Sequence, residues 1–212
     1  MADIDRLEHN GVPELLRKQV DIGSSRYAEV GAAVLTDSTG ELITSANPLP
    51  VSSSTKGYSA AVTLTRPADT NTYAFNDVLG AATGSTAALT FASMGPSAGR
   101  IMIVGAQFQV NDTGPISGEA SYVLHLYGVT PPSALGDNAA FDLPSGDRAS
   151  YLGFVNLGTP VDLGSTLYVE TANINKPLLL AGTSLFGYLV TVGAYTPTSA
   201  RVYVVTLHAL AV

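Results

Sequence analysis

The chain has 212 residues, a formal net charge of −7 and no cysteine. The absence of cysteine excludes disulfides, thiolate nucleophiles and cysteine-based metal sites. The negative charge argues against sequence-independent binding of nucleic acid, which requires a surface rich in lysine and arginine. No apolar run approaches the roughly 20 residues that a membrane-spanning helix needs, and the polar start of the chain does not resemble a secretory signal.

Charged residues make up only 13% of the chain, while hydrophobic residues make up 46%. This charged fraction is about half of that in an average globular protein. A monomer in free solution normally needs a charged surface to stay soluble. The composition therefore predicts that much of the surface is covered by other subunits. The alternative is a small stable β-domain whose surface is neutral but polar.

The first 57 residues differ from the rest in charge. Residues 1–30 hold ten of the 27 charged side chains of the chain. The pattern predicts one short helix over residues 12–20, with Pro13 at its first position and a narrow apolar stripe. A helix of this length is marginal in isolation, so we expect it to form only when it is docked.

Residues 47–57 have the Pro, Ser, Thr and Gly content of a linker. We therefore interpret residues 1–57 as an extended arm with at most one short helix. The apolar residues of the arm favour docking onto a partner over the alternative of a terminus without a role. The side chains expected to bind that partner are Arg6, Leu15, Leu16, Arg17, Lys18, Arg26 and Tyr27.

From Tyr58 onward, apolar segments rich in β-formers alternate with clusters of Gly, Pro, Asn, Asp and Ser. Nine strands at irregular spacing predict an all-β fold, an antiparallel two-sheet β-sandwich of the jelly-roll kind over residues 58–212. The predicted strands are 58–65, 72–79, 86–94, 100–110, 119–129, 150–157, 165–172, 184–195 and 201–211.

Alternation within the strands predicts which side chains share a face. In the strand 100–110, the expected inner face comprises Met102, Val104, Ala106, Phe108 and Val110. In the strand 119–129, it comprises Ala120, Tyr122, Leu124 and Leu126, with His125 facing outward. Residues 186–192 and 202–210 are apolar or small on both faces, which indicates central strands under cover or strands in a subunit interface.

No pattern of catalytic residues satisfies its structural requirement. Residues 95–99 match G-x-S-x-G, but a strand is predicted after them where a nucleophile elbow needs a helix, so we expect a turn. The three histidines form no zinc or triad pattern. Asp137, Asn138, Asp142 and Asp147 favour a solvated loop, with a divalent cation as the alternative. We expect no enzymatic activity and no cofactor.

Several segments resemble structural proteins of tailed-bacteriophage virions, most closely capsid decoration (cement) proteins. The resemblance covers most of the chain in texture and order, without a catalytic motif. The segments that carry it are 23–30, 64–80, 99–104, 124–132, 137–141 and 147–153.

This resemblance implies a homotrimer that binds the major capsid protein on the outer surface of the phage head and stabilises it. It implies synthesis in the host cytoplasm, and no binding to nucleic acid or membrane. A component of the tail, baseplate or fibre with a receptor-binding role is the alternative. An enzyme such as a polysaccharide depolymerase is the least favoured class, because the chain has no tryptophan to line a sugar-cleaving groove.

Overall fold

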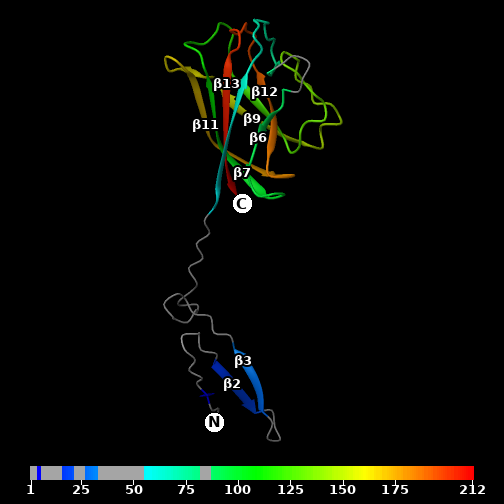
Figure 1. Ribbon diagram of the computed structural model, residues 1–212, viewed down its shortest axis with the longest axis vertical. Helices are drawn as coiled ribbons and strands as arrows, with labels where there is room; N and C mark the ends of the chain where they lie inside the picture. Colours follow the sequence, from blue (N-terminus) through cyan, green and yellow to red (C-terminus); the bar gives the residue numbers. More distant parts are fainter. Residues whose placement is uncertain (1–3, 6–15, 22–26, 33–54, 82–86) are drawn as a thin grey trace. The chain divides into compact units, whose positions relative to one another are not determined.

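The computed structural model describes residues 4–5, 16–21, 27–32, 55–81 and 87–212 (Figure 1). The chain divides into two compact units, Met1–Ser54 and Thr55–Val212, and we call the second unit the body. Every regular element in the described residues is a β-strand. None of the described residues belongs to a helix long and apolar enough to cross a membrane.

The described residues of the first unit form three short antiparallel strands, β1 (Ile4–Asp5), β2 (Leu16–Asp21) and β3 (Tyr27–Ala32), in the order β1-β2-β3. The predicted helix over 12–20 is therefore wrong for residues 16–20, which lie in β2, while 12–15 lie outside the described residues. The physical reason is that so short a helix is marginal alone. Pairing with β3, in the register Leu16↔Ala32 to Asp21↔Tyr27, satisfies the backbone instead.

The described residues of the body form ten strands, and all the pairings between them are antiparallel. Nearly all coincide with predicted strands, although the segments 72–79 and 86–94 contain strands of only two and three residues. The strands are β4 (Gly57–Thr65), β5 (Val78–Leu79), β6 (Leu89–Phe91), β7 (Arg100–Val110), β8 (Tyr122–Tyr127), β9 (Tyr151–Gly158), β10 (Val161–Asp162), β11 (Leu167–Leu179), β12 (Leu185–Thr191) and β13 (Val202–Ala211).

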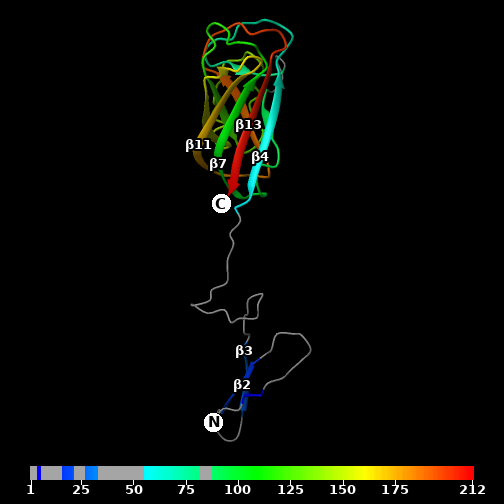
Figure 2. The same cartoon turned by 90° about the vertical axis from the view of Figure 1, so that its left-hand side faces the viewer.

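Two sheets of five strands pack face to face, which confirms the predicted two-sheet sandwich of the jelly-roll kind. The first sheet has the order β10-β11-β7-β13-β4, and Figure 2 shows its four long strands side by side. The second sheet has the order β5-β12-β8-β9, and β6 also pairs with β12. Most neighbours in space are not neighbours in sequence, so connections repeatedly cross from one sheet to the other.

The core lies between the sheets and consists of large apolar side chains with no exposure to solvent. Phe108 is central, with its ring centroid 4.5 Å from that of Tyr122 on the opposite sheet and 6.1 Å from that of Tyr203 beside it. Each side chain of this size stabilises the fold by about 1.5–3 kcal/mol on burial. Other fully buried members are Ile101, Ile103, Val110, Leu124, Leu126, Leu185, Leu189, Val205 and Leu207.

The predicted inner face of β7 is wrong in its first half. Ala106, Phe108 and Val110 face the core as expected, but Met102 and Val104 do not, and Ile101 and Ile103 are buried instead. The reason is a β-bulge: His208 of β13 pairs with Gly105, and Ala209 pairs with Ile103, so Val104 has no partner. One extra residue reverses the alternation on either side of it.

The apolar character of β12 on both faces has an internal cause. Leu185 and Leu189 face the core between the sheets, while Tyr188 and Val190 face a second cluster with Val78, Ala87 and Tyr127. Leu135, Phe141 and Leu143 from the connection between β8 and β9 pack against this cluster. The interpretation as a central strand under cover is therefore confirmed for β12.

A buried ion pair closes one end of the core. Arg201, directly before β13, is 2% exposed and donates from Nη1 and Nη2 to the carboxylate of Glu119 at 3.0 and 2.9 Å. The side chain of Glu119, before β8, is 1% exposed. Burial acts to lower the pKa of Arg201, but the hydrogen bonds with Glu119 outweigh it, so this pKa lies above its ordinary value. This pair of hydrogen bonds between Arg201 and Glu119, which we call the fork, therefore joins the two sheets.

The aromatic side chains beneath this fork share its hydrogen bonds. The Tyr122 hydroxyl donates to Glu119. The hydroxyl of Tyr195 lies 3.0 Å from that of Tyr122 and 3.1 Å from that of Tyr203. Burial raises the pKa of all three phenols, so they remain neutral donors.

Replacing Arg201 with methionine should destabilise the body strongly, because Glu119 would remain buried without its partner. Removal of one member of a buried ion pair typically costs about 3–5 kcal/mol in the free energy of unfolding. The measurement is chemical denaturation followed by circular dichroism. The control is Arg148→Met at an exposed position, where we expect a change of less than about 0.5 kcal/mol.

The double variant Arg201→Met/Glu119→Gln should recover part of that loss, since it removes the unpaired charge. A double variant that is destabilised by the sum of the two single changes would contradict the coupling between the two side chains.

Candidate functional site

The G-x-S-x-G segment is a turn and not a nucleophile elbow. Residues 95–99 connect β6 to β7, and the Gly99 amide donates to the Pro96 carbonyl at 3.0 Å. The element that follows is a strand, so Ser97 is not placed at the start of a helix. The interpretation of this motif as a turn is confirmed.

Two carboxylates of the acidic loop 137–147 are buried and accept hydrogen bonds from other parts of the body. Asp137 is buried, accepts hydrogen bonds from the Tyr73 hydroxyl and the Gly80 amide, and lies 3.9 Å from the guanidinium of Arg66. Gly80 has to be glycine here, because a Cβ would lie 2.9 Å from the Asp137 nitrogen. The favoured interpretation of a solvated loop is therefore wrong for Asp137.

Asp147 is buried as well and accepts hydrogen bonds from the amide and hydroxyl of Ser133. Of the four residues singled out in this loop, only Asp142 is exposed. Among the residues that the structure describes, no three His, Asp or Glu side chains are grouped so that they could hold a metal ion. The loop carboxylates thus anchor the long connection between β8 and β9 to the body.

Four of the seven arm residues expected to bind a partner are among the described residues, and three are not. Leu16, Arg17 and Lys18 lie in β2, and Tyr27 is the first residue of β3. Their backbone register places Lys18 between Ile4 and Val30. Arg6, Leu15 and Arg26 lie outside the described residues.

Many of the charged side chains of the body are buried. Six of the fifteen charged side chains in residues 55–212 are buried: Arg66, Asp77, Glu119, Asp137, Asp147 and Arg201. Arg66, for example, is 2% exposed and donates to the Asp69 carboxylate at 2.7 Å. The solvent-facing surface is therefore even poorer in charge than the composition alone implies.

The outer face of the first sheet is a continuous neutral surface. The strand β13, which lies between β7 and β4, presents Val202, Val204, Thr206, His208 and Leu210, which are half-buried and alternate with core residues. Cross-strand pairing extends this face into four rows, in which Glu170 is the only acidic or basic residue apart from His208. The rows are Thr63–Val204–Gln109–Tyr168, Ala61–Thr206–Gln107–Glu170, Ser59–His208–Gly105–Ala172 and Gly57–Leu210–Met102–Pro177.

The outer face of the second sheet carries an aromatic cluster around His125. The imidazole stacks on Phe141 at 3.8 Å between ring centroids, and its Nδ1 lies 2.9 Å from the Tyr151 hydroxyl. The Phe154 ring lies 5.8 Å away on the paired strand β9 and is 52% exposed. Burial lowers the pKa of His125 to about 4, so the imidazole is neutral at pH 7.

A shallow groove of about 610 Å³ runs along this cluster. It is lined by side chains of β8 and β9 and by the residue that follows β12, and none of them is acidic or basic except the neutral His125. The lining residues are Ser121, Val123, His125, Phe154, Asn156, Gly158 and Val192.

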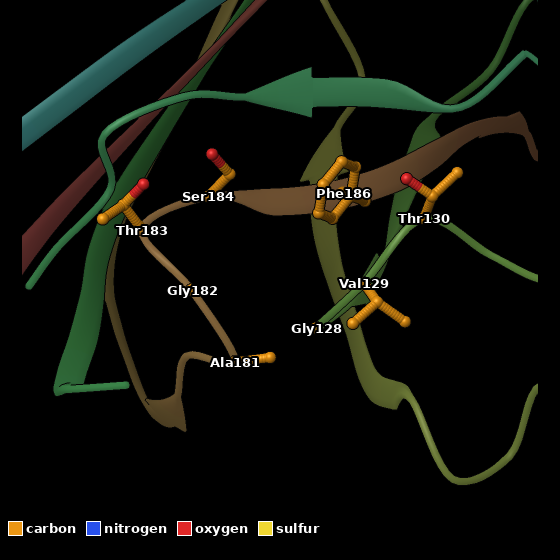
Figure 3. A pocket seen from close by; sticks show the side chains of 8 residues that line it. All are labelled: Gly128, Val129, Thr130, Ala181, Gly182, Thr183, Ser184 and Phe186. Atoms are coloured by element: carbon orange, nitrogen blue, oxygen red, sulfur yellow. The ribbon is translucent and has the colours of Figure 1, made fainter. Parts of the chain in front are cut away.

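A second hollow of about 390 Å³ lies at the start of β12 (Figure 3). Turns 128–130 and 181–184 flank Phe186, and the lining consists of small, apolar or hydroxyl side chains. No charged side chain lines it, so it lacks a group that could orient a charged ligand.

Sequence reasoning predicted the outward direction of His125 but missed its aromatic neighbours. The signal for Phe154 and Asn156 was present, because they alternate with the apolar Val155 and Leu157, which face the core. The contact with Phe141 had no local signal, because the connection between β8 and β9 brings this residue onto the sheet from a distance in the sequence.

Comparisons with known proteins find only remote likenesses. No protein-family model matches the chain, and no curated protein matches it. Among solved structures, a chain of the Israeli acute paralysis virus particle is similar at 12% identity and a TM-score of 0.27, over 90% of this chain and 89% of that chain.

A chain of infectious bursal disease virus is similar at 12% identity and a TM-score of 0.27, over 94% of this chain and 46% of that chain. A chain of a marine algae virus of the order Picornavirales is similar at 10% identity and a TM-score of 0.28, over 99% of this chain and 89% of that chain. TM-scores this low do not establish a shared fold, so the sandwich architecture rests on the strand pairing of this chain.

The buried His125 should make the body less stable in mild acid. Folding lowers the pKa of this imidazole from its ordinary value of 6.5 to about 4, so the unfolded chain binds a proton between these pH values and the folded chain does not. The stability is fully present above about pH 6.5 and declines as the pH falls towards 4. His125→Phe, which keeps an aromatic ring on Phe141, should reduce this decline in denaturation curves recorded at each pH.

The pKa itself is measured by NMR titration of the imidazole. Phe141→Leu should raise it towards 6.5, because the imidazole would lose the ring that covers it. A midpoint at or above 6.5 in the parent protein would contradict the burial of this side chain.

Proposed function

We propose that this protein is a non-enzymatic structural component of a virion, and specifically a decoration (cement) protein of a tailed phage. In this role it binds the major capsid protein on the outer surface of the head as a homotrimer and stabilises the shell. The observation that carries the proposal is the neutral outer face of the first sheet, with one acidic residue in four rows of paired side chains.

The size of this face fits an interface between subunits. Four long strands about 4.8 Å apart, each with about nine residues rising about 3.3 Å, cover about 600 Å² in projection. A standard protein interface buries about 800 Å² on each partner. Because few charged groups lie on this face, little charge has to be desolvated when a second subunit covers it.

The resemblance of the sequence to phage structural proteins supports the particle as the partner. Capsid lattices present the same site many times, so several weak contacts per oligomer add to strong attachment. The charged residues concentrated before position 31 are suited to a clamp on a neighbouring subunit. The side chains proposed for this clamp are those of the arm that were named from the sequence.

The second candidate function is a tail, baseplate or fibre component with a receptor-binding role. The exposed Phe154 beside a groove favours it, because recognition sites often present aromatic side chains. The copy number in purified particles distinguishes the two: a number comparable with that of the major capsid protein indicates the head, and a few copies indicate the tail.

A charge introduced into the neutral face should prevent self-association. Thr206 lies in the middle of β13 between Ala61 and Gln107, so Thr206→Asp would place a carboxylate at the centre of the interface. We expect the parent to form an oligomer in light scattering and this variant to approach the 21.8 kDa monomer with an unchanged far-UV spectrum. The control, Ser145→Asp at an exposed turn, should keep the parent's mass. A monomeric parent, or an unchanged mass for Thr206→Asp, refutes this interface.

Deletion of residues 1–54 should weaken attachment to the particle without unfolding the body, because Thr55–Val212 is a compact unit with its own core. The measurement is co-sedimentation of the full chain and the truncated chain with particles that lack the protein, together with thermal melting of each. Equal co-sedimentation of the two chains would exclude the arm as the clamp. A lower melting temperature for the truncated chain would show that the arm stabilises the body.

A further inference from the structure

We propose that the groove beside Phe154 binds a neutral saccharide. This site lies on the outer face of the second sheet, away from the neutral face assigned to self-association, and it does not depend on the assignment to a virion. Its components are an aromatic platform, neutral polar groups at its margin and a lining without charge.

The platform is the ring of Phe154, which is 52% exposed although a fully apolar side chain gains by burial. It lies on β9, an edge strand of the second sheet, where one flank of the strand has no neighbour in the sheet. The His125 imidazole lies 5.8 Å away at an interplanar angle of 46° and is itself held by Phe141 and Tyr151. The ring is therefore in contact with a fixed neighbour and still exposes about half of its surface at the groove, as a platform for the C–H face of a pyranose requires.

The polar groups at the margin can both donate and accept. Asn156 lies two residues from Phe154 on the same face of β9 and is exposed. Ser121 lies directly before β8, the strand paired with β9, and also lines the groove. Neither side chain makes a hydrogen bond within residues 55–81 and 87–212, so both remain available to hydroxyl groups, which need a donor and an acceptor.

The lack of charge selects the class of ligand. No acidic or basic residue other than His125 lines the groove, and its imidazole is uncharged at pH 7. Phosphate and carboxylate ligands normally require Arg, Lys or a cluster of backbone amides. A ligand without any polar group would leave the Asn156 amide covered without a partner, which is unfavourable. A neutral sugar carries no charge, can place its apolar face on Phe154, and has hydroxyl groups that can pair with Asn156.

The volume is consistent with a small glycan. Ligand sites typically occupy about 300–1,000 Å³, and this groove measures about 610 Å³. Its shallow, open form suits one or two rings of a longer chain that continues into solvent. It does not enclose a ligand, so we expect affinity in the millimolar to high micromolar range for single sugars.

The test is NMR titration of the full-length protein with methyl glycosides of glucose, galactose and mannose, with N-acetylglucosamine, and with maltohexaose. We expect at least one of these probes to shift the resonances of Phe154, Asn156 and their neighbours with saturation. Glucose 6-phosphate serves as the charged comparison and should bind more weakly than a glucoside. Absence of saturable shifts with every neutral probe, or stronger binding of the phosphate, overturns the proposal.

Variants then locate the site. Phe154→Ser should weaken binding on the order of tenfold by removing the platform, and Phe154→Trp should restore or strengthen it. Phe75→Ser is the matched control, since Phe75 is also a surface phenylalanine, 67% exposed, but does not line this groove. Retention of full affinity by Phe154→Ser, with the melting temperature of the parent, would show that the sugar binds elsewhere and overturn this assignment.

Discussion

The ion pair between Arg201 and Glu119 is the contact on which the closed end of the sandwich depends. Arg201 leads into β13 of the first sheet and Glu119 lies just before β8 of the second, so their two hydrogen bonds join the sheets. The neighbouring tyrosines complete the network through their hydroxyls. Since an unpaired buried charge costs several kcal/mol, loss of Arg201 would leave Glu119 as a buried carboxylate without a cationic partner. Arg66 has the corresponding role for the loop that carries Asp137, although its distance of 3.9 Å to that carboxylate indicates a weaker contact.

These internal pairs determine the character of the surface. A chain with few charged residues buries six of the fifteen in its body, so both outer sheet faces carry few charged groups. The first sheet presents four long strands with few charged side chains on their outer face, which suits contact with another subunit over a large area. The second presents an exposed aromatic ring beside amide and hydroxyl groups that make no hydrogen bond to the described part of the body, which suits a small polar ligand with an apolar side. The two proposals thus follow from one distribution of charge, and they concern different faces.

Local pattern was a good guide wherever a strand is regular. The predicted core positions Tyr122, Leu124 and Leu126 of β8 are buried, and the strands from Arg100 and from Tyr151 begin within one residue of the prediction. Prediction from local sequence pattern was wrong at three kinds of position. The bulge at Val104 depends on the partner strand β13 and has no signature in β7 itself. The segment 16–20 forms a strand because β3 pairs with it. Asp137 lies in turn-forming sequence, and only the fold brings Tyr73 and Arg66 to its carboxylate.

The amino-acid sequence by itself determined the all-β character of the body, because alternation and turn residues act over a few positions at a time. It also determined that the surface would be poor in charge, since composition limits what any fold can display. Only the tertiary structure decided which charges are buried, which sheet face is covered by the chain's own loops, and which aromatic side chain remains exposed. These outcomes depend on contacts between residues far apart in the sequence, such as Phe141 with His125, and no local pattern encodes them.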